Sequence, residues 1–160
     1  MNINIIIKKL IVVFLFFGFS CNVFADVVEN NILKLKALNY CIGCDLANGN
    51  FQDALLNGTD LTGSNLEGAN FEDGFLGWVN FSDTNLMGAN FNGTDLGVAN
   101  FTGANLTNVS FINARLAGTN FTDADLTGAD LTDTTLKGAI FKRAIFCNTK
   151  TPWGIDVSGC

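Results

Sequence analysis

From Leu46 to Phe146, a Leu or Phe stands at every fifth position, and this period constrains the fold more than any other feature of the chain. The register continues without a slip for twenty-one copies between residues 44 and 148. The position two before each Leu or Phe holds a small residue, most often Ala or Thr. Residues two apart in an extended segment point to the same side, so both positions face inward. The period predicts a solenoid, in which each repeat packs only on its neighbours.

The second residue after each Leu or Phe indicates a turn. It is Gly, Asn or Asp in eighteen of the twenty-one copies. These residue types tolerate the positive φ that a type II turn requires. A turn in every copy means that the chain changes direction after each short extended segment. The three exceptions are Trp78, Val98 and Arg143.

The repeat resembles the pentapeptide-repeat family, whose pattern is a small residue, Asp or Asn, Leu or Phe, and then two polar residues. Residues 69–73, 104–108 and 124–128 have this form. The resemblance covers residues 44–148. It implies an all-β fold, a right-handed quadrilateral β-helix with four pentapeptides in each coil.

The choice between Leu and Phe follows a longer period of twenty residues, which supports a four-sided coil. The inward rows that begin at Leu46 and Leu56 are Leu at every position except Phe146, and these two rows lie on opposite faces. The rows that begin at Phe51 and Leu61 are mostly Phe and also oppose each other. Like side chains can then stack in ladders and fill the bore at native density. Twenty-one copies make about five coils, and at one strand spacing per coil the rod is roughly 25 Å long.

Residues 1–25 have the composition of a secretory signal peptide. Lys8 and Lys9 supply its positive end, and residues 10–19 form its apolar core. Small residues follow at the two positions that a signal peptidase reads, which predicts a mature protein that begins at Asp26.

This leader predicts an exported protein, either periplasmic or secreted. Its apolar core is shorter than the roughly 20 residues that span a bilayer, so we expect no membrane span in the mature form. Two alternatives remain open. One is a lipoprotein that is cut before Cys21 and acylated there, and the other is a leader that stays in place as an anchor.

Both ends of the repeat carry segments of a different character. Residues 26–39 follow a helical pattern, and we expect this helix, within an N-terminal unit of residues 26–43, to cover the open end of the solenoid. A helix for a partner or a membrane is the alternative. Residues 149–160 resemble tails that close other pentapeptide-repeat proteins, and we interpret them as a second cap with Trp153 over the last Phe row. The expected apolar stripe of the helix consists of Val28, Ile32, Leu35 and Leu38.

Removing the leader leaves four cysteines, an even number that favours disulfides in an exported protein. Cα atoms more than about 7 Å apart cannot be bridged, and the two pairs lie at opposite ends of the rod. We therefore expect Cys41–Cys44 and Cys147–Cys160. The same separation excludes one zinc site shared by all four. A redox role for Cys41 and Cys44 would need a helix N-terminus that lowers a thiol pKa, so we interpret this pair as structural.

We expect no catalytic residues, no cofactor site and no metal site. The chain has no His, which excludes His-based catalysis and His metal ligands. Its net charge of −6 becomes −8 without Lys8 and Lys9, and an acidic protein is repelled by nucleic-acid phosphates. Asp60, Asp95, Asp125 and Asp130 occupy the Asn position of the repeat, so they belong to the repeat itself and form no acid–base pair.

One face departs from the repeat in an apolar direction. On the face with Leu56 in its inward row, the outward position reads Leu, Phe, Asp, Arg, Thr, where the other faces read mostly Asn or Asp. Clustered exposed aromatic residues are where interface energy tends to concentrate, which predicts a protein-binding site. The alternatives are drift on a tolerant surface, or Phe75 and Trp78 covering each other. We also expect Arg115 to pair with Asp95. The candidate partner-binding residues are Leu55, Phe75, Trp78, Val98 and Arg115.

The leading functional hypothesis is an exported, non-enzymatic module that binds an unknown protein. The resemblance suggests one rival, because some members of the family imitate duplex DNA and protect DNA gyrase from quinolones. An exported chain does not meet gyrase, which favours the first hypothesis. A third possibility is an ice- or crystal-binding face, suggested by a hydroxyl column of Thr62, Ser82, Thr102 and Thr122.

Overall fold

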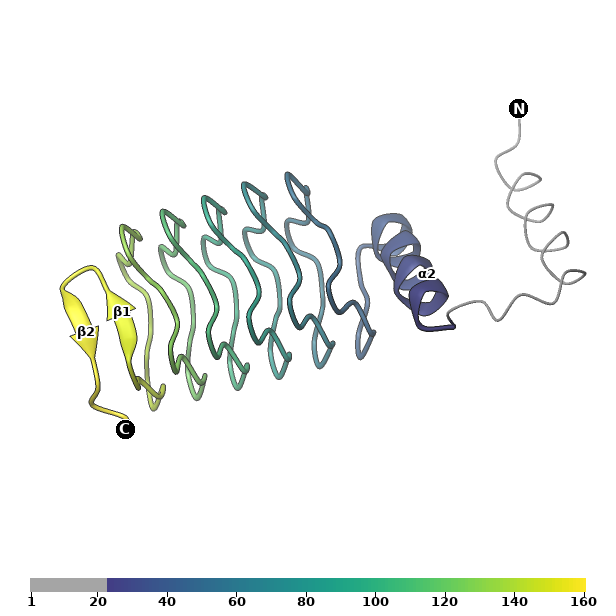
Figure 1. Ribbon diagram of the computed structural model, residues 1–160. Helices are drawn as coiled ribbons and strands as arrows, with labels where there is room; N and C mark the ends of the chain where they lie inside the picture. Colours follow the sequence, from purple (N-terminus) through teal and green to yellow (C-terminus); the bar gives the residue numbers. More distant parts are fainter. Residues whose placement is uncertain (1–22) are drawn as a thin grey trace, which may run out of the picture.

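The computed structural model describes residues 23–160. Most of the predicted leader, including Cys21, lies outside these residues. Helix α2 (Val23–Leu38) comes first, and strands β1 (Thr149–Thr151) and β2 (Gly154–Asp156) come last. Between them the chain winds through a stack of coils, with α2 beside the first coil and the two strands beside the last (Figure 1). No helix within residues 23–160 is both long enough and apolar enough to cross a membrane.

Parallel β-bridges join each coil to the next. Each bridge connects residues twenty apart, from Tyr40 with Asp60 to Asp130 with Lys150. Twenty residues are four pentapeptides, so the four-sided register that the Leu and Phe rows predict is present. Since every bridge has the same spacing, each side chain lies directly over its equivalent in the preceding coil.

The predicted turns are present in every copy. All twenty-one turn residues from Asn48 to Asn148 have positive φ, including the three exceptions. Trp78 has a φ of 63°, Val98 of 60° and Arg143 of 56°. A non-Gly residue with positive φ is uncommon, and for a bulky or β-branched side chain it is strained. The backbone of the coil therefore imposes this conformation even where the side chain opposes it.

The bore of the rod is filled by stacked rings. Phe101 is fully buried and lies parallel to Phe81, with ring centroids 4.9 Å apart and an interplanar angle of 7°. It meets Phe91 of the opposite row edge to face, with a centroid distance of 5.9 Å and an angle of 87°. Both geometries are favourable for aromatic pairs. The opposition of the two Phe rows predicted from the sequence is therefore what packs the core.

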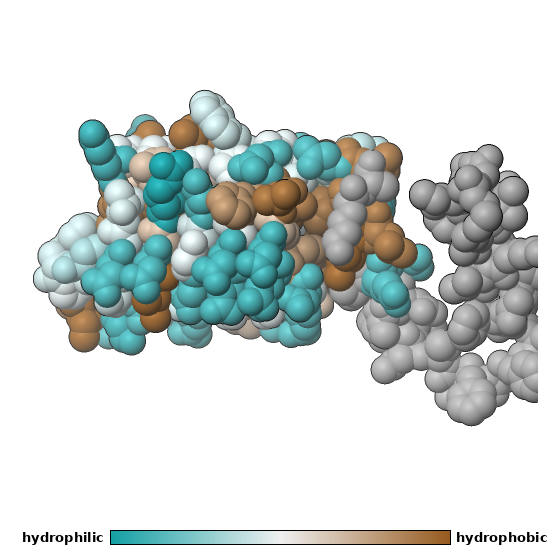
Figure 2. All heavy atoms as spheres, turned by 90° about the horizontal axis from the view of Figure 1, so that it is seen from above, coloured by the Kyte–Doolittle hydropathy of each residue, from teal (hydrophilic) through white to brown (hydrophobic). Residues whose placement is uncertain are grey.

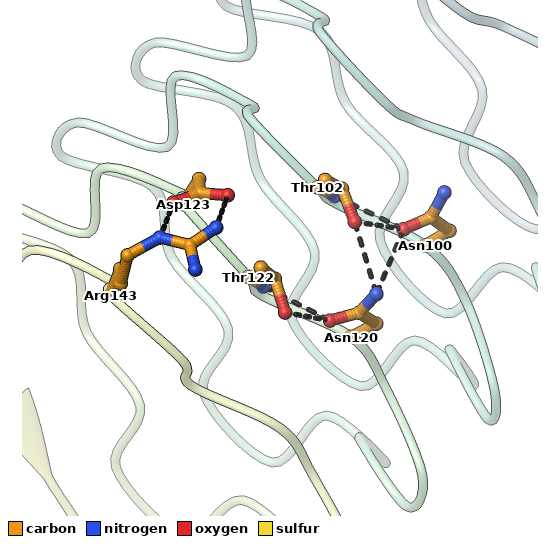
Figure 3. A network of polar contacts seen from close by, with 6 residues as sticks. All are labelled: Asn100, Thr102, Asn120, Thr122, Asp123 and Arg143. Atoms are coloured by element: carbon orange, nitrogen blue, oxygen red, sulfur yellow. Dashed lines mark hydrogen bonds and ion pairs between the residues drawn. The ribbon is translucent and has the colours of Figure 1, made fainter.

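Outside the core, Asn side chains form a second ladder, shown in Figure 3. Asn100 Oδ1 accepts hydrogen bonds from the Thr102 backbone N–H at 3.2 Å and from the Thr102 hydroxyl at 2.6 Å. Asn100 Nδ2 donates to Asn80 Oδ1 at 3.0 Å, one coil earlier. Asn120 Nδ2 donates to Thr102 Oγ1 at 3.0 Å, one coil later. The Asn position therefore stabilises its own turn and also the contact between coils.

Helix α2 differs from the prediction at both ends. It begins at Val23, three residues before Asp26, because residues 23–25 contain no Gly or Pro that would stop a helix. Ile32 and Leu35 pack against the core as predicted, and Leu35 is 1% exposed. Leu38, however, is 51% exposed and does not belong to the apolar stripe. Asn39 has a φ of 57°, which ends the helix and turns the chain into the first coil right after Leu38.

The C-terminal end also departs from the prediction. Strands β1 and β2 form an antiparallel hairpin in which Lys150 pairs with Ile155. Trp153 lies in the turn of this hairpin and is 71% exposed, so the prediction that it covers the last Phe row is wrong. Gly159 reaches the last coil instead, and its N–H donates to Phe146 O at 2.6 Å. A Cβ at Gly159 would lie 2.7 Å from Phe146 N, so only Gly fits there.

The structure contains both predicted disulfides. Cys41 and Cys44 are bridged at the start of the coils, with Cα atoms 5.5 Å apart. Cys147 and Cys160 are bridged at the other end, with Cα atoms 4.8 Å apart. Each disulfide ties a non-repeating segment to the coil next to it.

The core and the outer ladder should differ in their contribution to stability. Phe101→Ala should lower the free energy of unfolding by about 3–5 kcal/mol, because it leaves a cavity in the Phe stack. Asn100→Ala should lower it far less, by about 0.5–1.5 kcal/mol in total, because this outward side chain is half-exposed and water can replace most of its hydrogen bonds. Thermal or denaturant unfolding measures both. Equal losses for the two variants would contradict the inward assignment of Phe101.

Candidate partner-binding face

The face whose inward row contains Leu56 lacks the Asn ladder of the other faces. We call it the irregular face. Its outward column is connected by the bridges Leu55–Phe75, Phe75–Asp95 and Asp95–Arg115. The backbone is therefore as regular here as elsewhere, and only the side chains change. The full column is Leu55, Phe75, Asp95, Arg115 and Thr135.

Four apolar side chains of the irregular face are exposed. Leu55 is 75% exposed, Phe75 52%, Trp78 71% and Val98 44%. The outward position has no core to enter, and a turn residue with positive φ points away from the coil. Trp78 and Val98 stand one coil apart in the turn column that borders this face. We call these four residues the apolar patch.

Seen from above, apolar atoms gather on the part of the rod next to α2, and hydrophilic atoms lie beside them and farther along the rod (Figure 2). The ion pair that begins the polar part was predicted: Arg115 Nε lies 2.9 Å from Asp95 Oδ1. Gly97 makes room for it, because a Cβ there would lie 3.1 Å from Arg115 Nη2. The pair is largely exposed, so its contribution to stability is about 0–1 kcal/mol. In the outward column, this ion pair follows the apolar Leu55 and Phe75, so the column has an apolar part next to α2 and a charged part after it.

Acidic side chains border the apolar patch on the other side. Asp53 and Asp73 occupy the turn column next to Leu55 and Phe75, and both are exposed. Glu72 is adjacent in the chain and half-buried. Carboxylates therefore border the Leu55 and Phe75 side of the patch, opposite the turn column that holds Trp78 and Val98.

The hydroxyl column on the neighbouring face is engaged within the protein. Thr62 Oγ1 donates to Asp60 Oδ1 at 2.6 Å, and Thr122 Oγ1 donates to Asn120 Oδ1 at 2.7 Å. These hydroxyls hold their own turns, which disfavours the ice-binding hypothesis.

Two features of the surface were not predicted from the sequence. The first explains the turn exception Arg143, whose guanidinium pairs with Asp123 one coil earlier (Figure 3). The hydrogen bond from Arg143 holds the pKa of the Asp123 carboxyl below its usual value. The position of Arg143 twenty residues after an Asp was a signal for this pair.

The second feature is a hollow of about 220 Å³ between α2 and the first coil, at the end of the apolar patch. Its walls include Leu35 of α2 and Phe51 and Leu56 of the first coil, and Leu55 forms part of its rim. It depends on how the helix packs, which the repeat does not encode. Within residues 23–160, no group of three or more acidic or cysteine side chains is placed to hold a metal ion.

A family model for pentapeptide repeats matches residues 40–74, 75–103 and 99–138, with eight copies. The matched segments cover more than half of the chain. The chain belongs to the pentapeptide-repeat family. This bears out the resemblance drawn from the repeat.

Solved structures of other pentapeptide repeat proteins are similar to this one. For Rfr23 from the cyanobacterium Cyanothece 51142, the identity is 29% and the TM-score 0.71, over 72% of this chain and 92% of Rfr23. For HetL, involved in heterocyst differentiation regulation in the cyanobacterium Nostoc sp. strain PCC 7120, the identity is 25% and the TM-score 0.53, over 72% of this chain and 60% of HetL. For a protein of the Arabidopsis thaliana thylakoid lumen, the identity is 34% and the TM-score 0.48, over 62% of this chain and 70% of that one.

The family and the similarity to Rfr23 identify the stack of coils in this pentapeptide repeat protein as a right-handed β-helix. A comparison with the curated proteins gave no match.

Proposed function

We propose that this pentapeptide repeat protein is an exported, non-enzymatic interaction module whose irregular face binds a protein partner. The observation that carries the proposal is the apolar patch, which gathers four exposed apolar side chains at the α2 end of one face, whereas other exposed apolar side chains such as Ile140, Ile145 and Ile155 lie near the C-terminal end. These four side chains are 44–75% exposed and stand where most copies of the repeat carry Asn, Asp or Gly. Exposed apolar residues gathered in one place are typical of a surface that a partner covers.

The rod supports this role because it is rigid. We propose about five coils, with α2 packed against one end and residues 149–160 against the other. Stacked rings and side-chain ladders connect each coil to the next, so the patch keeps its shape before binding. A preformed surface loses little conformational entropy when a partner docks.

The residues of the patch also do not stabilise the fold in the way that the usual residues of the repeat do. Asn80 occupies the outward position of a regular face and donates to Asp60 Oδ1 at 3.3 Å and to Thr62 Oγ1 at 2.8 Å. Phe75 at the equivalent position can form no such bonds, and Trp78 replaces a Gly, Asn or Asp at a strained φ of 63°. Phe75 and Trp78 therefore make the coil less stable than the usual residues of the repeat would. Binding of a protein partner is a reason for their presence.

Export is the second part of the proposal. It rests on the composition of residues 1–25 and on the two disulfides, since disulfides persist in oxidising compartments. The native product should begin at Asp26, which mass spectrometry of the protein from its source determines. A diacylglyceryl group on Cys21 would support the lipoprotein alternative, and a product that retains Lys8 and Lys9 would contradict both.

The double variant Phe75→Asn, Trp78→Gly tests the binding face. Both changes restore the repeat, and Gly relieves the positive φ, so thermal stability should hold or rise slightly. Affinity for a partner isolated with the parent from the exported fraction should fall by about 2 kcal/mol or more, roughly thirtyfold. Titration calorimetry with the purified partner measures the difference.

Arg115→Ala is the matched control, because it changes the charged part of the same face and should weaken binding much less. A partner that binds the double variant as tightly as the parent would contradict this binding face. If that partner were a DNA-binding enzyme, the result would favour the DNA-mimic alternative.

A further inference from the structure

Each coil forms backbone hydrogen bonds with the coil before it. In the second coil, Phe75 N–H donates to Ala54 O at 2.8 Å, and Phe75 O accepts from Leu56 N–H at 2.9 Å. Gly77 O accepts from Gly58 N–H at 2.9 Å. On the irregular face, three polar backbone groups of each coil thus point toward the N-terminal end of the rod.

The equivalent groups of the first coil are Leu55 N–H, Leu55 O and Asn57 O. Within the described residues, 23–160, no backbone group bonds to any of them, because the preceding chain is in α2 and not in a coil. The first bridge of this column is Leu55–Phe75, with no rung before it. Residues 54–57 therefore present an open strand edge, and such an edge is a template for another extended chain.

The hollow lies directly inside this edge. Phe51 is 3% exposed and Leu56 6%, whereas their equivalents one coil later, Phe71 and Leu76, are fully buried. The volume of about 220 Å³ is below the roughly 300–1,000 Å³ of small-molecule sites, so it suits an apolar side chain better than a cofactor. The open edge and the hollow together resemble one coil from which a pentapeptide is missing.

We propose that an extended segment of the partner adds to this edge as one more rung of the irregular face. Its backbone C=O accepts from Leu55 N–H, and its N–H groups donate to Leu55 O and Asn57 O, as Ala54, Leu56 and Gly58 do for the second coil. Its inward apolar side chain stacks on Leu56 and fills the hollow. Strand addition of this kind takes its affinity from main-chain hydrogen bonds and its specificity from pockets for alternate side chains.

The chemistry of the segment follows from the border of the patch. Asp53 is exposed beside Leu55 in the first coil, and Asp73 lies one coil farther along, so an outward-pointing Lys or Arg of the segment meets the carboxylate of Asp53. The occupant is thus an extended segment that alternates apolar and cationic residues. This inference rests on the proposed function, because it names how the partner reaches the apolar patch.

The probe is a short peptide that alternates leucine and lysine, with a leucine–glutamate peptide as its control. The full mature protein is titrated at low ionic strength, where exposed charges are least screened. The leucine–lysine peptide should bind at least about tenfold tighter than its control, and the Leu55 amide should exchange with solvent more slowly in the complex. Equal binding of the two peptides, or an unchanged Leu55 exchange rate, would overturn the proposal. Slower exchange that grows with protein concentration alone would assign the edge to a second copy.

Two substitutions at one position separate the backbone from the side chain. Leu55→Ala removes the side chain and keeps the N–H, whereas Leu55→Pro removes the N–H as well, which no described backbone group uses in the free protein. Both should unfold at similar temperatures. Leu55→Pro should bind the leucine–lysine peptide about two- to tenfold more weakly than Leu55→Ala.

Equal affinity of these two variants would contradict strand addition. If, in addition, Phe75→Asn with Trp78→Gly still weakened binding of the natural partner, the proposed function would stand and only the mode of binding would fail. If none of the variants changed binding of that partner, the proposed function itself would be wrong.

Discussion

The structure depends on the stacking of each residue on its equivalent twenty positions earlier. One register aligns three independent interactions: backbone hydrogen bonds between coils, parallel Phe rings in the bore, and Asn ladders on the outside. Each pentapeptide alone could bury very little apolar surface, so the coil is stable only through its neighbours. The same dependence explains why the first and last coils need other segments to cover them.

Much of the fold could be predicted from the sequence because the repeat makes every position report on the same geometry. The turn residues, the opposed Phe rows and both disulfides agree with the structure. The errors lie where the repeat stops. The start of α2, the exposed Leu38 and the exposed Trp153 depend on how unique segments meet the ends of the coils, and no period describes those contacts.

In the candidate site too, the features that follow from the repeat were predicted and those at its end were not. The apolar patch and the Asp95–Arg115 pair were predicted from the sequence, because a departure from a regular column is visible when the column is known. The hollow and the open edge were not, since the hollow depends on how Leu35 of α2 meets the first coil and the edge on which backbone groups α2 leaves unbonded. The regular faces bond most of their outward side chains to one another, whereas the irregular face next to α2 combines exposed apolar side chains with backbone groups that no described backbone group bonds.

The most direct test of this account compares two deletions. Removing residues 84–103 takes out one whole coil and leaves every later side chain in its own row. Removing residues 99–103 takes out one pentapeptide and moves every later side chain to the neighbouring face, so that Phe111 stacks on Leu86. Thermal unfolding should show the twenty-residue deletion to be a cooperative fold that melts at a higher temperature than the five-residue deletion. A five-residue deletion as stable as the twenty-residue deletion would show that the register between coils does not hold this protein together.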